Sequence, residues 1–262
     1  MAARIWTAYT VELFKALRHR FTYIGPLLVL LVIVLMTLTH PLERDGQGDY
    51  DFIAGATAVA LDSLGLLLVL AFSAALIASE LGAGSIRLAL VRPLHRYEFV
   101  VAKLLLGMSY AVLLALVAGV ASWAMAYALG DVRGVSYGGE LVYTAEEMRE
   151  TYLLGLLLTL APLWAAVAFA VMLSTLTRSA AAAVTGTIGI WLVADLTKHP
   201  LGIHHYVFTT YVESPLQVFA QKCDAYTLPW FPMAWYCLGT SAVVFVVCAA
   251  VSIYVLDRRN LT

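Results

Sequence analysis

The sequence predicts an all-α integral membrane protein with six transmembrane helices, and three observations lead to this fold class. Of the 262 residues, 62% are hydrophobic and only 13% are charged, about half the charged share of a typical soluble domain. The mean hydropathy is +0.85. The apolar residues gather in six runs that are close to the roughly 20 residues a helix needs to cross the hydrocarbon core. The predicted spans are residues 21–39, 54–79, 99–129, 152–176, 180–197 and 233–256.

The placement of lysine and arginine predicts that both termini are cytosolic, because inner loops of membrane proteins are enriched in these residues. In this orientation eleven of the sixteen basic residues fall on the inner side, and most acidic residues fall on the outer side. Residues 1–262 then form one transmembrane domain within the lipid bilayer. The formal net charge of −1, without a basic tail, gives no indication of nucleic-acid binding.

The first 20 residues have the pattern of an amphipathic helix that lies on the inner membrane surface. Apolar residues recur at a spacing near four, and charged residues project elsewhere. The apolar positions are Ile5, Tyr9, Leu13 and Leu17, and the charged ones are Glu12, Lys15, Arg18 and Arg20. A basic cluster that only sets the topology is the alternative interpretation.

Residues 80–98 form the first inner loop, between the second and third spans. Gly82 and Gly84 loosen the end of the second span, and Pro93 interrupts a helix-compatible stretch. A helix, a break and a second helix would make a rigid cytosolic projection, since a flexible tether would be richer in glycine and serine. A plain connector whose arginines follow the positive-inside rule remains the alternative.

Two outer segments carry local signals. Thr144 and Glu147 fit a capping box, so a helix is expected to begin at Ala145 and to lead into the fourth span. The segment 198–232 is too long to be a featureless loop. Its prolines and aromatic residues favour a re-entrant or interfacial structure.

Polar residues within the spans are the candidates for a substrate path. A charged carboxylate in lipid costs at least about 2.5 kcal/mol, so Asp62 and Asp195 should each face protein, water or a partner. Asp62 is the stronger candidate, because Asp195 lies three residues before Lys198 and a local ion pair is the simpler interpretation.

Three histidines, His199, His204 and His205, lie close together in the chain. They could hold a metal ion only if the chain folds back on itself, because their spacing matches no helical pair of ligands. Solvated histidines at the membrane interface are the favoured interpretation, and no metal is expected.

The sequence contains no pattern of an intramembrane protease and no nucleotide-binding loop of the type G-x-x-x-x-G-K-[ST]. We therefore expect that the chain is not an enzyme, holds no cofactor of its own and cannot hydrolyse ATP by itself.

Three stretches together resemble the permease subunits of ABC-2 type transporters, whose transmembrane domains are of the type V exporter kind. They are "VELFKALRHR" near the N-terminus, "SELGAGSIRLALVRPLHRYEFVVAKLL" after the second span, and the basic end "DRRNLT". The second stretch matches the family pattern at Glu80, Gly84, Ser85, Arg87, Arg92, Pro93, Arg96, Phe99 and Lys103. The resemblance covers the whole chain in topology but only these short stretches in motif.

This resemblance implies a permease in a bacterial cytoplasmic (inner) membrane that works with separate subunits. Two copies of a cytosolic ATPase would bind ATP and Mg²⁺, and a second permease, a copy or a paralogue, would pair with this one. Residues 80–98 would be the coupling loop that docks on the ATPase. The resemblance does not indicate which substrate is exported or handled outside the cytoplasm. It also does not indicate whether an extracytoplasmic accessory protein takes part.

A secondary transporter or a membrane scaffold without an energy source is the alternative function. A secondary transporter should show an internal repeat and broken helices near the bilayer midplane, and no such repeat is visible between the two halves of the chain.

Overall fold

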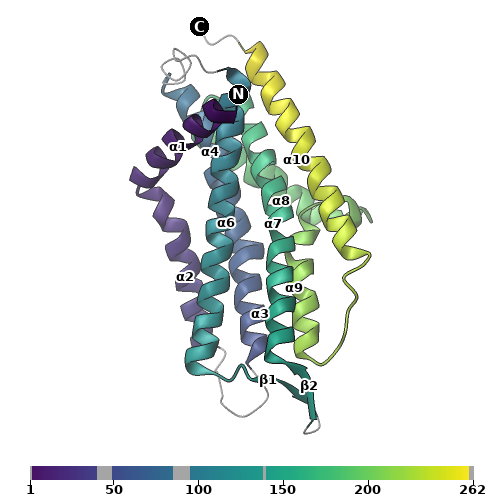
Figure 1. Ribbon diagram of the computed structural model, residues 1–262. Coiled ribbons are helices and arrows are strands. Elements are labelled where there is room, and N and C mark those ends of the chain that lie inside the picture. The colour runs from purple at the N-terminus through teal and green to yellow at the C-terminus, as the bar shows by residue number, and fades with distance from the viewer. Residues whose placement is uncertain (1, 40–48, 85–94, 138–139, 260–262) are drawn as a thin grey trace.

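A computed structural model describes residues 2–39, 49–84, 95–137 and 140–259. Nearly all of this structure is helical, and the longest helices run side by side along one axis (Figure 1). The helices are α1 (Ala2–Arg18), α2 (Phe21–Thr39), α3 (Tyr50–Ala58), α4 (Leu66–Gly82), α6 (Arg96–Leu129), α7 (Ala145–Leu176), α8 (Ala180–Lys198), α9 (Thr210–Cys223) and α10 (Met233–Arg258). A π-helical segment, η1 (Val59–Gly65), joins α3 to α4, and a 3₁₀ turn, η2 (His204–Tyr206), precedes α9.

Among the described residues, six helices are long and apolar enough to cross a membrane, which confirms the predicted class of a multi-pass all-α membrane protein. They are α2, the continuous α3–η1–α4, α6, α7, α8 and α10. Three of them begin earlier than predicted, at Tyr50, Arg96 and Ala145. The early start at Ala145 follows from the predicted capping box, in which Thr144 and Glu147 cap each other's backbone N–H groups ahead of the apolar run.

The six spans differ in how much of each is buried within the chain. Within the apolar 18-residue stretch that defines each span, half of the residues of α3–η1–α4, α6 and α7 are buried, against 22% for α2, 17% for α10 and 11% for α8. The first three therefore form the packed centre, and the other three present most of their apolar side chains outward, as lipid-facing helices do. Small residues permit the close approach at the centre: a Cβ at Gly107 of α6 would lie 2.5 Å from Val167 of α7.

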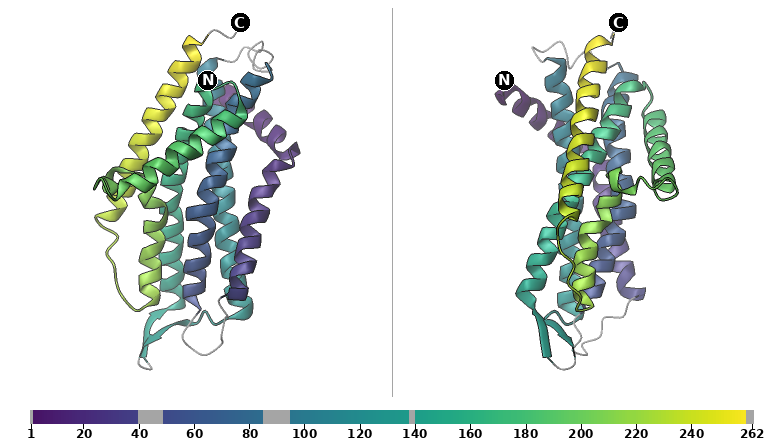
Figure 2. Two further views of the ribbon diagram at one scale, coloured as in Figure 1. Left: turned by 180° about the vertical axis from the view of Figure 1, so that it is seen from behind. Right: turned by 90° about the vertical axis from the view of Figure 1, so that its right-hand side faces the viewer.

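The two ends of the bundle are different. The start of α1 and the end of α10 lie at one end, and the two-stranded antiparallel hairpin of β1 (Gly134–Tyr137) and β2 (Glu140–Thr144) lies at the other (Figure 1). Behind the bundle, α8 slants from near the end that holds the termini to about mid-height, and α9 continues from that level towards the hairpin end (Figure 2). The segment 198–232 thus contains helix α9, which packs on α7 and α3, as expected for a segment that is not a featureless loop.

Candidate functional site

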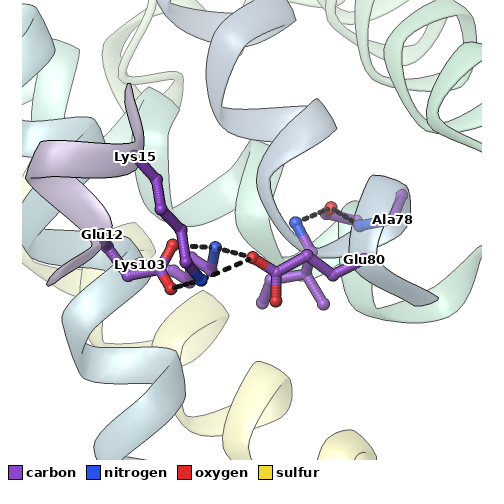
Figure 3. Close-up of polar contacts among 7 residues, drawn as sticks. Glu12, Lys15, Ala78, Glu80 and Lys103 are labelled. Atoms are coloured by element: carbon purple, nitrogen blue, oxygen red, sulfur yellow. Dashed lines mark hydrogen bonds and ion pairs between the residues drawn. The ribbon is translucent and has the colours of Figure 1, made fainter. Parts of the chain in front are cut away.

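Four charged side chains from three helices meet at the end of the bundle that holds the termini, and we call them the ion cluster. Its members are Glu12 and Lys15 of α1, Glu80 of α4 and Lys103 of α6 (Figure 3). The Lys103 ammonium group bonds to the Glu12 carboxylate and lies 2.6 Å from Glu80 Oε1. Lys15 Nζ lies 2.6 Å from Glu12 Oε1 and 3.7 Å from Glu80 Oε1. Each carboxylate therefore has two ammonium partners.

The centre of the ion cluster is buried. Lys103 is 2% exposed and Glu12 is 7% exposed, while the side chain of Lys15 is about half exposed. Charges removed from water in this way are tolerated only when opposite charges and hydrogen bonds compensate them. The cluster therefore holds α1 against α4 and α6, and the loss of one buried member leaves another charge uncompensated.

The protonation of the α1 members follows from these contacts. Burial alone would raise the pKa of Glu12, but the charges and hydrogen bonds of Lys103 and Lys15 outweigh it and hold the pKa below its ordinary value. Burial would likewise lower the pKa of Lys15, and Glu12 and Glu80 more than offset that effect, so the pKa is raised. Both groups are thus held in their charged forms at neutral pH.

The inward position of Glu12 corrects the expectation that it projects away from the apolar face together with Lys15, Arg18 and Arg20. Glu12 follows Tyr9 by three residues, so both lie on one side of α1. The Tyr9 hydroxyl forms a 2.8 Å hydrogen bond with Ser109 of α6, which turns that side towards the bundle. Arg18 and Arg20 are exposed.

The ion cluster lies at both ends of the predicted coupling loop. Glu80 is in the last turn of α4, and Lys103 is about two turns into α6. Gly84 follows α4 with a φ of +68°, a conformation that favours glycine. The other predicted coupling residues between these helices, Ser85, Arg87, Arg92 and Pro93, lie outside the described residues.

Arg96 connects the start of α6 to the end of α10. Its Nη1 donates hydrogen bonds to the backbone carbonyls of Leu256 at 2.9 Å, Asp257 at 2.5 Å and Arg259 at 3.2 Å. These carbonyls belong to the last turn of α10 and the residue after it, where a cation is favoured by the helix dipole. The Arg259 guanidinium in turn donates to the carbonyl of Thr175 at the end of α7. Arg96 thus has a structural partner within the chain.

A cavity of about 620 Å³ adjoins the ion cluster, between α1, α4 and α6. Glu12, Lys15, Glu80 and Lys103 line it together with apolar side chains such as Phe72. The cluster is therefore reachable from one side, although its central lysine is buried.

A second cavity, of about 600 Å³, lies between η1, the end of α8 and the start of α9, and we call it the polar cavity. It brings together both predicted intramembrane carboxylates, Asp62 and Asp195, with Glu213 of α9. The predicted local ion pair is confirmed: Lys198 Nζ lies 2.6 Å from Asp195 Oδ1, which also accepts a 3.0 Å hydrogen bond from Thr209. Sequence reasoning missed Glu213 because no pattern in the chain links α9 to the second span.

The three histidines lie near one another without forming a metal site. The ring centroids of His199 and His204 are 5.4 Å apart, and those of His204 and His205 are 3.9 Å apart. Across the part of the chain that the structure describes, no group of three or more histidine, cysteine, aspartate or glutamate side chains is placed to hold a metal ion. Burial and the neighbouring histidines lower the pKa of His204.

Comparison with known proteins identifies a family whose function is unknown. A family model described as a protein of unknown function, DUF2705, matches residues 31–262. This match covers all six candidate spans except the start of the first. No curated protein matches the chain. Since the matched region is most of the sequence, the chain belongs to the DUF2705 family.

Proposed function

We propose that this chain is the membrane-spanning permease subunit of an ATP-binding cassette transporter. It would couple ATP hydrolysis by a separate ATPase subunit to export or extracytoplasmic handling of a substrate. The observation that carries the proposal is the ion cluster, which fastens α1 to the two helices on either side of residues 85–94. A force applied to that segment would reach α1, α4 and α6 together.

The contacts at this end of the bundle support the mechanical role. In the chain, α4 ends at Gly82 and α6 begins at Arg96, so a force on the connection between them would act on two membrane spans. Arg96 and Arg259 tie the same end of the bundle to α10 and α7. Contiguous contacts of this kind are one way in which a displacement is carried through packed helices. A scaffold protein has no need of a buried charge cluster at this position, since it costs desolvation free energy.

The remaining parts of the proposal follow the resemblance of the sequence. Two ATPase copies would bind ATP and Mg²⁺, and a second permease, identical or paralogous, would complete the membrane unit. The protein would reside in the bacterial cytoplasmic membrane with both termini cytosolic. Arg87 and Arg92 would contact acidic groups of the ATPase, while Glu80 and Lys103 would position the loop rather than touch the partner.

The test compares charge reversal at the two ends of the molecule. The chain is purified with an affinity tag in mild detergent, and co-purifying proteins are tested for a nucleotide-binding loop and for ATPase activity. We expect that Arg87→Glu with Arg92→Glu removes the ATPase, and that the matched change Arg133→Glu retains it. Arg133 lies at the hairpin end, and its side chain is 93% exposed. Arg96 is unsuitable for this test because its loss would also disturb α10.

Two results would contradict the proposal. An unaltered ATPase yield in the loop variant would remove the docking assignment. Transport by the pure chain in vesicles, without ATP, would favour the alternative function of a secondary transporter. In that case the carboxylates of the polar cavity would belong to its substrate path.

A further inference from the structure

The cavity of about 620 Å³ between α1, α4 and α6 changes in polarity along its length. We call it the elbow cavity, because the turn from α1 to α2 bounds it. The ion cluster forms its charged end (Figure 3). Away from the cluster the lining is apolar and includes Phe72 and Leu76 of α4 and Leu106 of α6. Phe72 is about 12 Å from Glu80 along the helix. A charged end above an apolar depth is the polarity profile of a phospholipid.

The apolar part of the elbow cavity has to be filled. Phe72 and Leu76 belong to the span Tyr50–Gly82, so this part lies at the depth of the hydrocarbon core. An empty space would cost its lining the dispersion contacts that neighbouring atoms provide. Water is a poor occupant, because each buried water needs two or more polar partners. An acyl chain is the apolar group that a bilayer supplies at this depth.

Basic side chains flank the charged end of the cavity. Lys15 lines it, and its side chain is 53% exposed. Arg18 and Arg20 are exposed on the turn from α1 to α2, and Arg178 is exposed two residues before Ala180, which lines the cavity from α8. Among the residues that the structure describes, none of these three arginines forms an ion pair. Basic residues at this depth attract the headgroups of anionic lipids.

We propose that the elbow cavity binds one anionic phospholipid from the leaflet at the end of the bundle that holds the termini. The phosphate meets Lys15 and the arginines of the two turns, and an acyl chain enters between Leu76 and Leu106. The Lys15 ammonium group has three N–H donors. Its contacts with Glu12 at 2.6 Å and Glu80 at 3.7 Å leave at least one of them for a phosphate oxygen. This lipid site is independent of the proposed function as a permease.

The test uses the purified full-length chain in mild detergent and a phosphatidylglycerol that carries a photoreactive diazirine in its acyl chain. Mass spectrometry locates the labelled peptides. We expect label on the lining of α4 and α6, near Phe72, Leu76 and Leu106. Unlabelled phosphatidylglycerol should compete at a concentration about tenfold or more below that of phosphatidylcholine with the same chains. Glycerol 3-phosphate should not compete, because it has no chain to fill the cavity.

Arg18→Gln together with Arg20→Gln tests the headgroup contact. Each basic residue near an anionic lipid surface contributes about fivefold in affinity. The double variant should therefore weaken phosphatidylglycerol about tenfold or more and leave phosphatidylcholine nearly unchanged. Arg133→Gln with Arg149→Gln is the matched control, because both side chains are exposed at the hairpin end, 93% and 60% respectively.

Ala75→Phe tests the acyl-chain contact. Ala75 lines the cavity and is half-buried, so a phenyl ring there occupies the space of the chain. Labelling should fall severalfold, and both lipids should compete less well. Ala250→Phe is the matched control, because Ala250 is exposed on α10, which does not line the cavity.

Four outcomes would overturn the proposal. Equal competition by the two lipids would remove the preference for an anionic headgroup, and full competition by glycerol 3-phosphate would indicate a site for soluble phosphates. Label spread over α8 and α10 without an excess at the elbow cavity would indicate ordinary surrounding lipid. Unchanged labelling in Ala75→Phe would place the chain elsewhere. The headgroup and chain variants are independent, so either one decides if the other fails to fold.

Discussion

Replacement of Lys103 by methionine tests whether the ion cluster holds α1 on the bundle. Lys103 is 2% exposed and bonds to two carboxylates, Glu12 and Glu80. Methionine fills a similar volume without a charge, so the packing is kept. Only the positive charge that compensates the two carboxylates is lost. The removal of one partner of a buried ion pair costs about 3–5 kcal/mol. Lys15 still faces both carboxylates, which places the expected loss near the lower value, about 3 kcal/mol.

Lys15→Met is the matched control on the same cluster. Its side chain is 53% exposed, and an exposed ion pair contributes about 0–1 kcal/mol because water screens it. Thermal unfolding in one detergent, followed by intrinsic fluorescence, should show a midpoint about 10 °C lower for Lys103→Met, since about 1 kcal/mol shifts a chain of this size by roughly 2–4 °C. The control should shift by no more than about 4 °C.

A local measurement separates the detachment of α1 from general instability. Trypsin cleavage after Arg18 should accelerate in Lys103→Met before the rest of the chain is cut, because α1 loses its buried ion pair with α6 and keeps only weaker contacts such as the Tyr9–Ser109 hydrogen bond. Stability should largely return when Glu12→Gln and Glu80→Gln are added, since no buried charge then remains without a partner and the half-exposed Lys15 is solvated by water. If Lys103→Met and Lys15→Met cost the same, below about 1 kcal/mol, the cluster does not hold α1.

Three further predictions concern single contacts, each checked by thermal unfolding. Because the pKa of Glu12 is lowered in the folded chain, the ionised carboxylate stabilises the fold fully at pH values above 4.5, its ordinary pKa. This stabilisation is lost as the pH falls through the lowered pKa, so Glu12→Gln should make the unfolding temperature less sensitive to acid. Gly107→Ala places a Cβ 2.5 Å from Val167 and should cost about 1–3 kcal/mol. Gly186→Ala, which has open space around it inside α8, should instead stabilise by about 0.5–1 kcal/mol, because alanine favours the helix. Thr144→Ala should cost about 1 kcal/mol through the lost cap of α7; no difference from the parent would contradict the role of the cap.

Features that depend on neighbouring residues could be predicted from the sequence. The spans follow from apolar runs of sufficient length, because lipid requires every backbone polar group to be bonded within a helix. The start of α7 follows from Thr144 and Glu147, three residues apart, and the Asp195–Lys198 pair follows from the same spacing. Each of these involves residues within one helical turn, where spacing determines geometry.

Features that depend on distant residues could not be predicted. Glu12 and Lys103 are separated by 91 positions, and nothing in either stretch indicates which lysine a given glutamate meets. The expectation that Glu12 projects away from the apolar side of α1 was wrong for this reason. The π-helical turn at Val59–Gly65 is also invisible in the sequence, because the largely apolar run around Asp62 has no periodicity that distinguishes wider helical turns from ordinary ones.

Both candidate sites lie on one span, Tyr50–Gly82, and this arrangement gives the permease proposal a physical route. Glu80 is in the last turn of the span, and Asp62 is about 27 Å away at the rise of an ordinary helix. Between them Ser174 of α7 donates a hydrogen bond to the Ala74 carbonyl and accepts bonds from the next turn of α4. These bonds hold α4 on α7 between the two sites. In the proposed permease, a displacement at the ion cluster would therefore have to be carried past this contact, by α4 and α7 together, to reach the polar cavity.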